Sequence, residues 1–289
     1  NREGITMKIN SLQPELLEAK KLTRFKGFYC MAGFVVRFNR HGKPYWVITL
    51  MDAFTKFEIV ATQIDCDIKH FSHFGFVHVE ATKVKTTVGK VYVADFIYAV
   101  DEIPEKYRHI RLIPRDASAN HEDVARLVKI VDCIEYEALK RFVAQTLIQS
   151  RIMVPFLRNP ASLNYHHNYI GGLLRHSIRV AELFAENMVG RKEEKALGIV
   201  GALLHDIGKS VTLSESMIYT ATGTMVNHDS LTLELCASAL KLLSKTNPRY
   251  ADILRHIWTC EKEQLKYSAK LNIATQIQRF DREDSKEQT

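Results

Sequence analysis

His205 and Asp206 stand side by side in the stretch ALLHDIGKS, directly after an apolar run and before a glycine and a lysine. Burying two titratable groups costs several kcal/mol unless they are paired or bind a metal ion. Imidazole nitrogens and carboxylate oxygens together are suitable ligands for a divalent transition metal. The pair therefore predicts a metal site whose other ligands come from elsewhere in the chain.

Further histidines and an aspartate follow a definite order in the same half of the chain. His176 precedes the pair, while His228, His256 and Asp281 follow it. A single histidine is more often a surface or core residue than a ligand. The order of the whole set, however, makes each member a candidate.

Two positions in this set have rivals. Asn227-His228-Asp229-Ser230 contains a second His-Asp pair, but it lacks the apolar run before and the Gly-Lys after. We therefore interpret His228 as the candidate ligand and Asp229 as a capping or surface residue. Near the C-terminal end, Asp284 is an alternative to Asp281, and the sequence leaves that choice open.

The order of a histidine, a His-Asp pair and a final aspartate over residues 121–281 resembles the HD-domain superfamily of metal-dependent phosphohydrolases. The resemblance implies four ligands for one metal ion: His176, His205, Asp206 and Asp281. It places His228 and His256 where two-metal members hold a second ion, with Asp206 as the bridge. One or two ions of Mn²⁺, Fe²⁺, Co²⁺, Ni²⁺ or Zn²⁺ suit these donors better than Mg²⁺, which prefers oxygen ligands.

Three residues near the ligands are candidates for catalysis. Lys209 completes an HD-x-G-K pattern and would neutralise charge on a phosphate; the alternative is a solvated lysine at a helix end. His166 and His167 would contact substrate phosphate or donate a proton to the leaving oxygen. The equal alternative is a loop pair whose rings pack and hydrogen-bond locally.

The stretch NYHHNYIGGLLRH, residues 164–176, resembles one subset of the superfamily. These are bacterial 3′-to-5′ exoribonucleases that join an N-terminal OB fold to an HD domain, and GKPYWVITLMDAFTKFEIVA (42–61) is similar to their nucleic-acid-binding OB domain. The segment from Pro160 is also similar to the HD-like domain in relaxases of integrating conjugative elements. The resemblance implies a phosphodiesterase acting on single-stranded RNA or DNA, most specifically a 3′-to-5′ exoribonuclease. The alternatives are a nucleotide or cyclic-nucleotide phosphohydrolase, and a nucleic-acid-binding relaxase module without turnover.

The spacing of apolar residues differs between the two halves of the chain and predicts the elements that position these residues. Residues 25–100 hold 15 of the 27 aromatic residues, and their apolar positions often alternate, which predicts strands at 28–38, 44–51, 57–61, 76–84 and 91–99. Five short strands in this layout predict an OB-fold barrel. From residue 121 a three-and-four spacing predicts helices, over 124–134, 139–147, 172–188, 192–205, 230–244, 250–259 and 269–280.

The predicted fold is therefore α+β with two domains. An N-terminal extension covers residues 1–24, and a five-stranded OB-fold β-barrel that binds nucleic acid covers 25–100. A linker with two prolines and several charges covers 101–120. An all-α HD domain with phosphohydrolase activity covers 121–289.

A net charge of +7 permits an anionic partner, although basicity this mild is common among unrelated enzymes. Binding of a single strand needs aromatic faces for base stacking and a cationic groove. The candidates on the predicted barrel are each either aromatic or basic: Arg37, Arg40, Lys43, Tyr45, Trp46, Lys83, Lys85 and Lys90. Most aromatic residues on strands face a core, but Tyr45 and Trp46 cannot both do so in one regular strand.

Composition excludes several other classes. The five cysteines are scattered and never spaced as C-x-x-C, which excludes a disulfide framework and a zinc ribbon. No stretch approaches the roughly 18 apolar residues of a membrane span, and the first residues lack a signal-peptide pattern. We therefore expect a cytoplasmic protein that does not bind membranes, and the sequence leaves open whether it forms a homo-oligomer.

Overall fold

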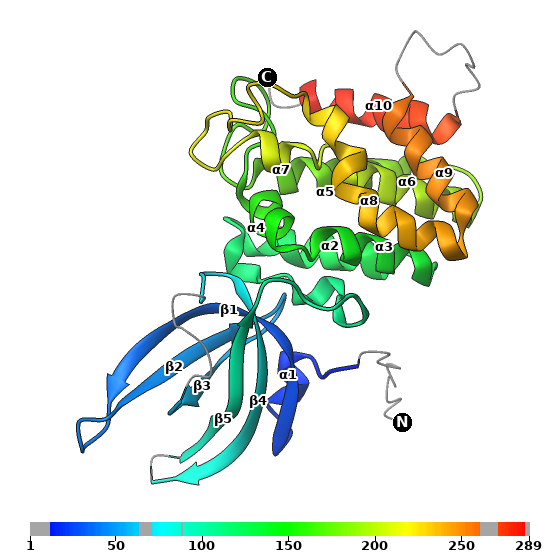
Figure 1. Cartoon of the computed structure of the whole chain (residues 1–289). Helices are drawn as coiled ribbons and strands as arrows, with labels where there is room; N and C mark the ends of the chain where they lie inside the picture. The colour runs from blue at the N-terminus through cyan, green and yellow to red at the C-terminus, as the bar shows by residue number, and fades with distance from the viewer. Residues whose placement is uncertain (1–11, 64–70, 88, 261–270, 287–289) are drawn as a thin grey trace. The chain divides into compact units, whose positions relative to one another are not determined.

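The structure, a computed structural model, describes residues 12–63, 71–87, 89–260 and 271–286. Its contacts divide the chain into two units, residues 1–109 and 110–289 (Figure 1). The first unit is built of strands and the second of helices, which confirms the predicted α+β class. The boundary lies inside the segment that the sequence indicated as a linker.

The first unit is a closed barrel of five strands (Figure 1). The strands are β1 (Arg24–Phe38), β2 (Pro44–Met51), β3 (Lys56–Ala61), β4 (Gly75–Thr86) and β5 (Gly89–Val100). Their order is β1-β2-β3-β5-β4, and β1 also pairs with β4 to close the barrel. The β3–β5 pair is parallel and the others are antiparallel. A closed barrel of five strands is the architecture predicted from the alternating apolar residues.

A short helix, α1 (Leu16–Ala19), packs against this barrel. Leu16 and Ala19 are fully buried, and the Tyr92 hydroxyl on β5 donates a hydrogen bond to the Ala19 carbonyl. The Leu16 amide donates to the carboxylate of Asp52, in the turn between β2 and β3. The predicted N-terminal extension therefore packs against the barrel through the buried side of α1.

The second unit consists of helices in its described residues (Figure 1). They are α2 (His121–Asp132), α3 (Glu137–Leu147), α4 (Ser150–Arg158), α5 (Gly172–Asn187), α6 (Lys192–Leu204), α7 (Lys209–Thr212), α8 (His228–Thr246), α9 (Pro248–Thr259) and α10 (Asn272–Lys286). Helix α10 packs on α5 and α6, and α8 packs on α3 and α9. These contacts bring the second turn of α5, the end of α6 and the end of α10 together.

Two of these helices were not predicted. Helix α4 contains Pro155, which lacks the amide proton of an ordinary helical residue, and α7 is only four residues long. Neither helix therefore has a long, uninterrupted three-and-four spacing of apolar residues, which is the pattern that predicted the other helices. No helix within the described ranges combines the length and apolarity needed to cross a membrane.

Asp52 joins α1 to the barrel and supports a test of that packing. Its side chain is buried and accepts hydrogen bonds from the amides of Leu16, Phe54 and Thr55. Asp52→Ala should lower the free energy of unfolding by about 3 kcal/mol, because buried amides lose their acceptor. Urea unfolding followed by tryptophan fluorescence measures this change.

Asp95→Ala is the matched control for this variant. Asp95 lies half-exposed on β5 and accepts from the Thr82 hydroxyl, which water can satisfy instead. Its replacement should change stability by no more than about 0.5 kcal/mol. Equal losses for the two variants would contradict the role assigned to Asp52.

Candidate metal centre

Three separate helices supply the residues that converge in the second unit. His176 lies in the second turn of α5, and His205 is the C-cap residue directly after α6. Asp206 follows in the turn that leads to α7. Asp281 and Asp284 lie three residues apart on α10 and therefore share one face of that helix.

Four atoms of these residues face one another. His176 Nε2 lies 3.2 Å from His205 Nε2, 3.3 Å from Asp206 Oδ2 and 3.3 Å from Asp281 Oδ1. His205 Nε2 lies 3.5 Å from Asp206 Oδ2 and 3.7 Å from Asp281 Oδ1. The structure therefore brings together all four residues predicted to hold the first ion.

These distances fit a coordination shell. Bonds of about 2.1 Å separate neighbouring ligand atoms by about 3.0 Å around an octahedral ion and by about 3.4 Å around a tetrahedral one. The observed separations of 3.2–3.7 Å overlap the upper part of that range and slightly exceed it. In addition, the ring of His205 can donate its Nδ1 proton to the Ala202 carbonyl at 2.7 Å, which leaves the Nε2 lone pair for a metal. The residues present thus suit a divalent ion.

The charges of the cluster also favour a cation. Burial lowers the pKa of His176, but the carboxylates of Asp206, Asp281 and Asp284 outweigh burial and raise it to about 10. Burial raises the pKa of Asp206, yet Lys209 and the neighbouring imidazoles hold it well below its usual range. The carboxylates therefore attract positive charge to this site, which a divalent ion would supply.

Asp206 also faces a second group of donors. Its Oδ1 lies 3.3 Å from His228 Nε2, on the first turn of α8, so its two oxygens serve different neighbours. A side chain at Gly208 would collide with the backbone of His228, and glycine there permits this close approach. Asp229 lies 3.3 Å from His228 and is largely exposed, while Asn227 caps the helix. The structure thus places His228 against the pair, and an oxygen of the exposed Asp229 carboxylate also lies within 4.8 Å of the facing atoms of Asp206 and His228.

The structure does not bring His256 to either group. His256 lies in the last turn of α9, and its Nε2 accepts a hydrogen bond from the Leu271 amide at 3.2 Å. Among the described residues, the candidate metal-binding groups omit both His256 and Asp281, but Asp281 lies 3.3 Å from His176 and 3.7 Å from His205, whereas the contact found for the His256 ring is the one to Leu271. The sequence order alone predicted this ligand, because spacing along the chain does not indicate which way α9 turns its last residues.

Lys209 is held next to the cluster at the start of α7. Its Nζ lies 2.5 Å from Asp206 Oδ2. The side-chain amide of buried Asn159 donates to the carbonyls of Lys209, Ser210 and Leu213, which fixes the α7 turn. Sequence reasoning missed Asn159, since nothing in its neighbours indicates this contact.

The two adjacent histidines have different surroundings. The ring of His166 is half-buried, 5.1 Å from the ring of His176, and its Nε2 meets the Ser285 hydroxyl at 3.2 Å. Burial lowers the pKa of His166. His167 is buried, and both of its ring nitrogens have partners, Tyr169 and Asp284. His166 therefore remains a candidate for substrate contact, whereas His167 has no free nitrogen to offer a substrate.

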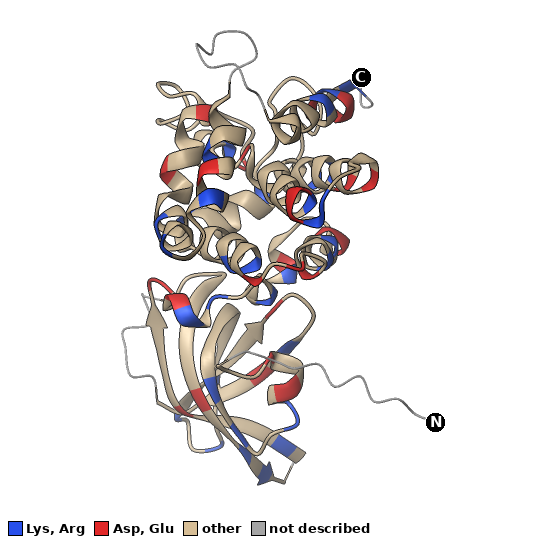
Figure 2. Ribbon diagram, turned by 90° about the vertical axis from the view of Figure 1, so that its right-hand side faces the viewer, with Lys and Arg blue, Asp and Glu red and all other residues tan. Residues whose placement is uncertain are grey.

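The candidate nucleic-acid residues lie on the β1–β2 and β4–β5 hairpins of the barrel, where Figure 2 shows Lys and Arg in blue. Tyr45 and Trp46 are half-buried, and both line an open groove with Asn39 and Lys43. The five exposed basic candidates are Arg37, Arg40, Lys43, Lys85 and Lys90. Lys83 differs from them, because its Nζ donates to the Lys20 carbonyl and lies over the Tyr92 ring.

Comparison with known proteins relates the chain to enzymes that cleave phosphate esters. A dihydroneopterin 2′,3′-cyclic phosphate phosphodiesterase of Methanocaldococcus jannaschii is 31% identical over 134 residues, which cover 42% of this chain and 52% of the relative. The 3′-5′ exoribonuclease YhaM of Listeria welshimeri is 29% identical over 105 residues, and that of Listeria innocua over 107. Each of these two alignments covers 35% of this chain and 33% of the relative.

The chain thus spans about half, or a third, of the length of the curated relatives it matches. No solved structure matches it. The sequence pattern of the HD-domain family matches residues 173–285, a range that contains every ligand candidate identified above. Residues 173–285 therefore form an HD domain, the family that the order of the histidines and aspartates resembles.

Proposed function

We propose that the chain is a metal-dependent phosphodiesterase that acts on single-stranded nucleic acid, most specifically as a 3′-to-5′ exoribonuclease. The observation that carries the proposal is the convergence of two imidazoles and two carboxylates at ligand spacing within an HD domain. The two exoribonuclease relatives support the substrate class.

His176, His205, Asp206 and Asp281 would hold the first ion, and Asp206 with His228 would contact a second. When bound, divalent ions of this type activate water for attack on phosphorus and neutralise developing charge. Lys209, beside the same carboxylate, would bind a phosphate oxygen and stabilise charge in the transition state. His166 lies at the edge of the cluster and would contact the substrate there.

The barrel would bind the single strand. Tyr45 and Trp46 offer ring faces beside Lys43 in one groove, which combines base stacking with attraction to the backbone phosphates. The second candidate function is hydrolysis of a small cyclic phosphate, which the Methanocaldococcus relative favours. In that case the metal centre would be the same, and the groove would have another purpose.

The metal centre is tested by counting bound ions. Asp206→Ala should abolish binding of Mn²⁺, because this carboxylate faces both donor groups. His228→Ala should remove at most one ion, and His256→Ala should remove none, since the His256 ring is engaged with Leu271. Equilibrium dialysis of the full chain against Mn²⁺, followed by metal analysis, gives the stoichiometry; an Asp206→Ala protein that retains it would refute the site.

The reaction is tested with a single-stranded RNA labelled at its 5′ end. In Mn²⁺ the full chain should produce a ladder of labelled products that shorten stepwise, because removal proceeds from the 3′ end. His205→Ala should abolish the ladder while leaving strand binding intact, since the ligand and the groove lie in different units. Gel electrophoresis of timed samples measures both.

Two substrates distinguish the candidate functions. A circular RNA of the same sequence has no 3′ end and should resist digestion by an exonuclease. A nucleoside 2′,3′-cyclic phosphate reports the alternative activity. Turnover of the cyclic phosphate without shortening of the RNA would contradict the exoribonuclease proposal and support the second candidate.

The groove is tested by strand binding in the inactive His205→Ala background. Tyr45→Ala and Trp46→Ala should each weaken binding by about 1–3 kcal/mol, the contribution of one stacked base. Fluorescence anisotropy with labelled RNA measures the affinity, which should also fall as salt rises. Phe96→Ala is the control, because this exposed aromatic residue lies on β5 and does not line the groove; equal losses for all three variants would exclude a specific role for the groove.

A further inference from the structure

His176 uses its two ring nitrogens for different partners. Nε2 faces the group formed with His205, Asp206 and Asp281, whereas Nδ1 lies 2.8 Å from Asp284 Oδ2. Asp284 is 2% exposed and lies one turn beyond Asp281 on α10. The two aspartates of one helix face thus approach opposite edges of one imidazole.

The distances from the carboxylate oxygens to the imidazole nitrogens give Asp281 and Asp284 different roles. Asp281 Oδ1 lies 3.3 Å from His176 Nε2, which suits two ligands around one ion. Asp284 Oδ2 lies 2.8 Å from each imidazole it meets, which is hydrogen-bond distance and shorter than the roughly 3.0 Å that neighbouring ligands of a metal require. Asp284 therefore contacts His176 as a hydrogen-bond acceptor.

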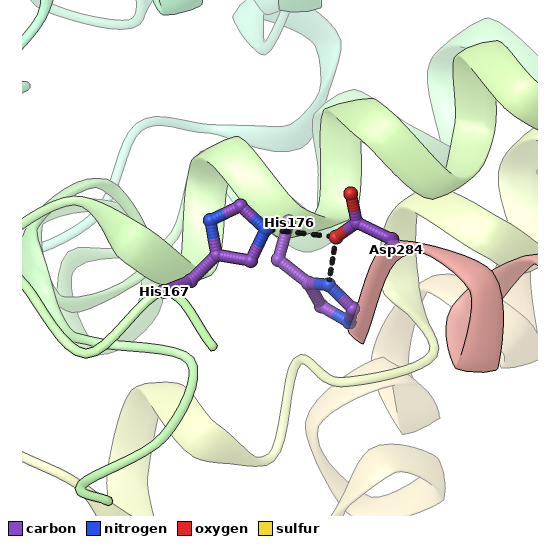
Figure 3. Close-up of side chains that lie close together, drawn as sticks. All are labelled: His167, His176 and Asp284. Carbon is purple, nitrogen blue, oxygen red and sulfur yellow. Dashed lines mark hydrogen bonds and ion pairs between the residues drawn. The ribbon is translucent and has the colours of Figure 1, made fainter. Parts of the chain in front are cut away.

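The second imidazole on Asp284 belongs to His167 (Figure 3). His167 Nε2 lies 2.8 Å from the same carboxylate oxygen, and His167 Nδ1 lies 2.9 Å from the hydroxyl of Tyr169. A continuous chain of hydrogen bonds therefore runs from Tyr169 through His167 and Asp284 to His176.

The backbone around His167 is arranged to make this chain. His167 adopts φ +51°, a left-handed conformation that costs energy for a residue with a side chain. Its carbonyl accepts from the Ala161 amide, and it approaches Gly172 so closely that a Cβ there would collide with it. The two glycines at the start of α5 therefore allow the His167 loop to pack against the helix that carries His176.

We propose that Asp284 and His167 are positioning residues of the metal centre, which hold the His176 ring with its Nε2 lone pair directed at the ion. The proton inventory is consistent: Tyr169 donates to His167 Nδ1, and His167 Nε2–H and His176 Nδ1–H both donate to Asp284. An acceptor on the distal nitrogen fixes the tautomer and orientation of a metal-binding histidine. The inference rests on the metal centre of the proposed function and not on its substrate.

Co²⁺ alone tests this proposal in the full chain, because its visible absorption reports the ligand geometry independently of activity. Asp284→Ala should weaken Co²⁺ binding about 10- to 100-fold, the usual effect of removing such a partner, and should alter the absorption of the saturated site. Asp284→Asn keeps an acceptor oxygen and should recover part of the affinity. His167→Asn, which tolerates the left-handed backbone, should cause a smaller loss.

Glu283→Gln is the control, because Glu283 neighbours Asp284 on α10 but pairs with exposed Arg279. It should leave both Co²⁺ affinity and absorption unchanged, and circular dichroism confirms that each variant folds. Wild-type affinity and absorption in Asp284→Ala would overturn the proposal. Complete loss of binding in both Asp284→Ala and Asp284→Asn, as expected of a ligand such as Asp281, would also overturn it. Neither result depends on whether RNA is cleaved.

Discussion

The helical unit is organised around three carboxylates that converge on one buried imidazole. Asp206, Asp281 and Asp284 all lie within hydrogen-bond or ion-pair distance of His176, whose ring is fully buried. Buried charges of like sign are tolerated only when cations or donors satisfy them. The imidazoles and Lys209 supply part of that compensation, and the proposed divalent ion would supply the rest. The packing of α5, α6 and α10 therefore depends on the chemistry at their meeting point.

Each member of the cluster is held by something outside it. The Ala202 carbonyl orients His205, Asn159 fixes the turn that carries Lys209, and Asp284 orients His176. Such contacts restrict the rings and carboxylates to one arrangement before an ion arrives. A rigid set of ligands binds a metal more tightly and selectively than a flexible one.

The barrel follows simpler rules than the metal centre. Its strands form because alternating apolar residues fill a closed interior, and α1 is integrated by burial of Leu16 and Ala19 and by the carboxylate of Asp52. These local patterns made the five strands predictable. The groove beside Tyr45 and Trp46 was less predictable, because alternation alone would place neighbouring residues on opposite faces.

The sequence by itself determined the strands, all described α-helices of the second unit except α4 and α7, and the His-Asp pair with its partners in order, because periodicity and residue type act locally along the chain. Only the tertiary structure decided which partners meet. It set Asp281 and Asp284 on opposite nitrogens of His176, buried His167 behind them, and engaged His256 with Leu271. The physical reason is that ligand geometry depends on where separate helices cross and how each ring is rotated, and spacing in the sequence specifies neither.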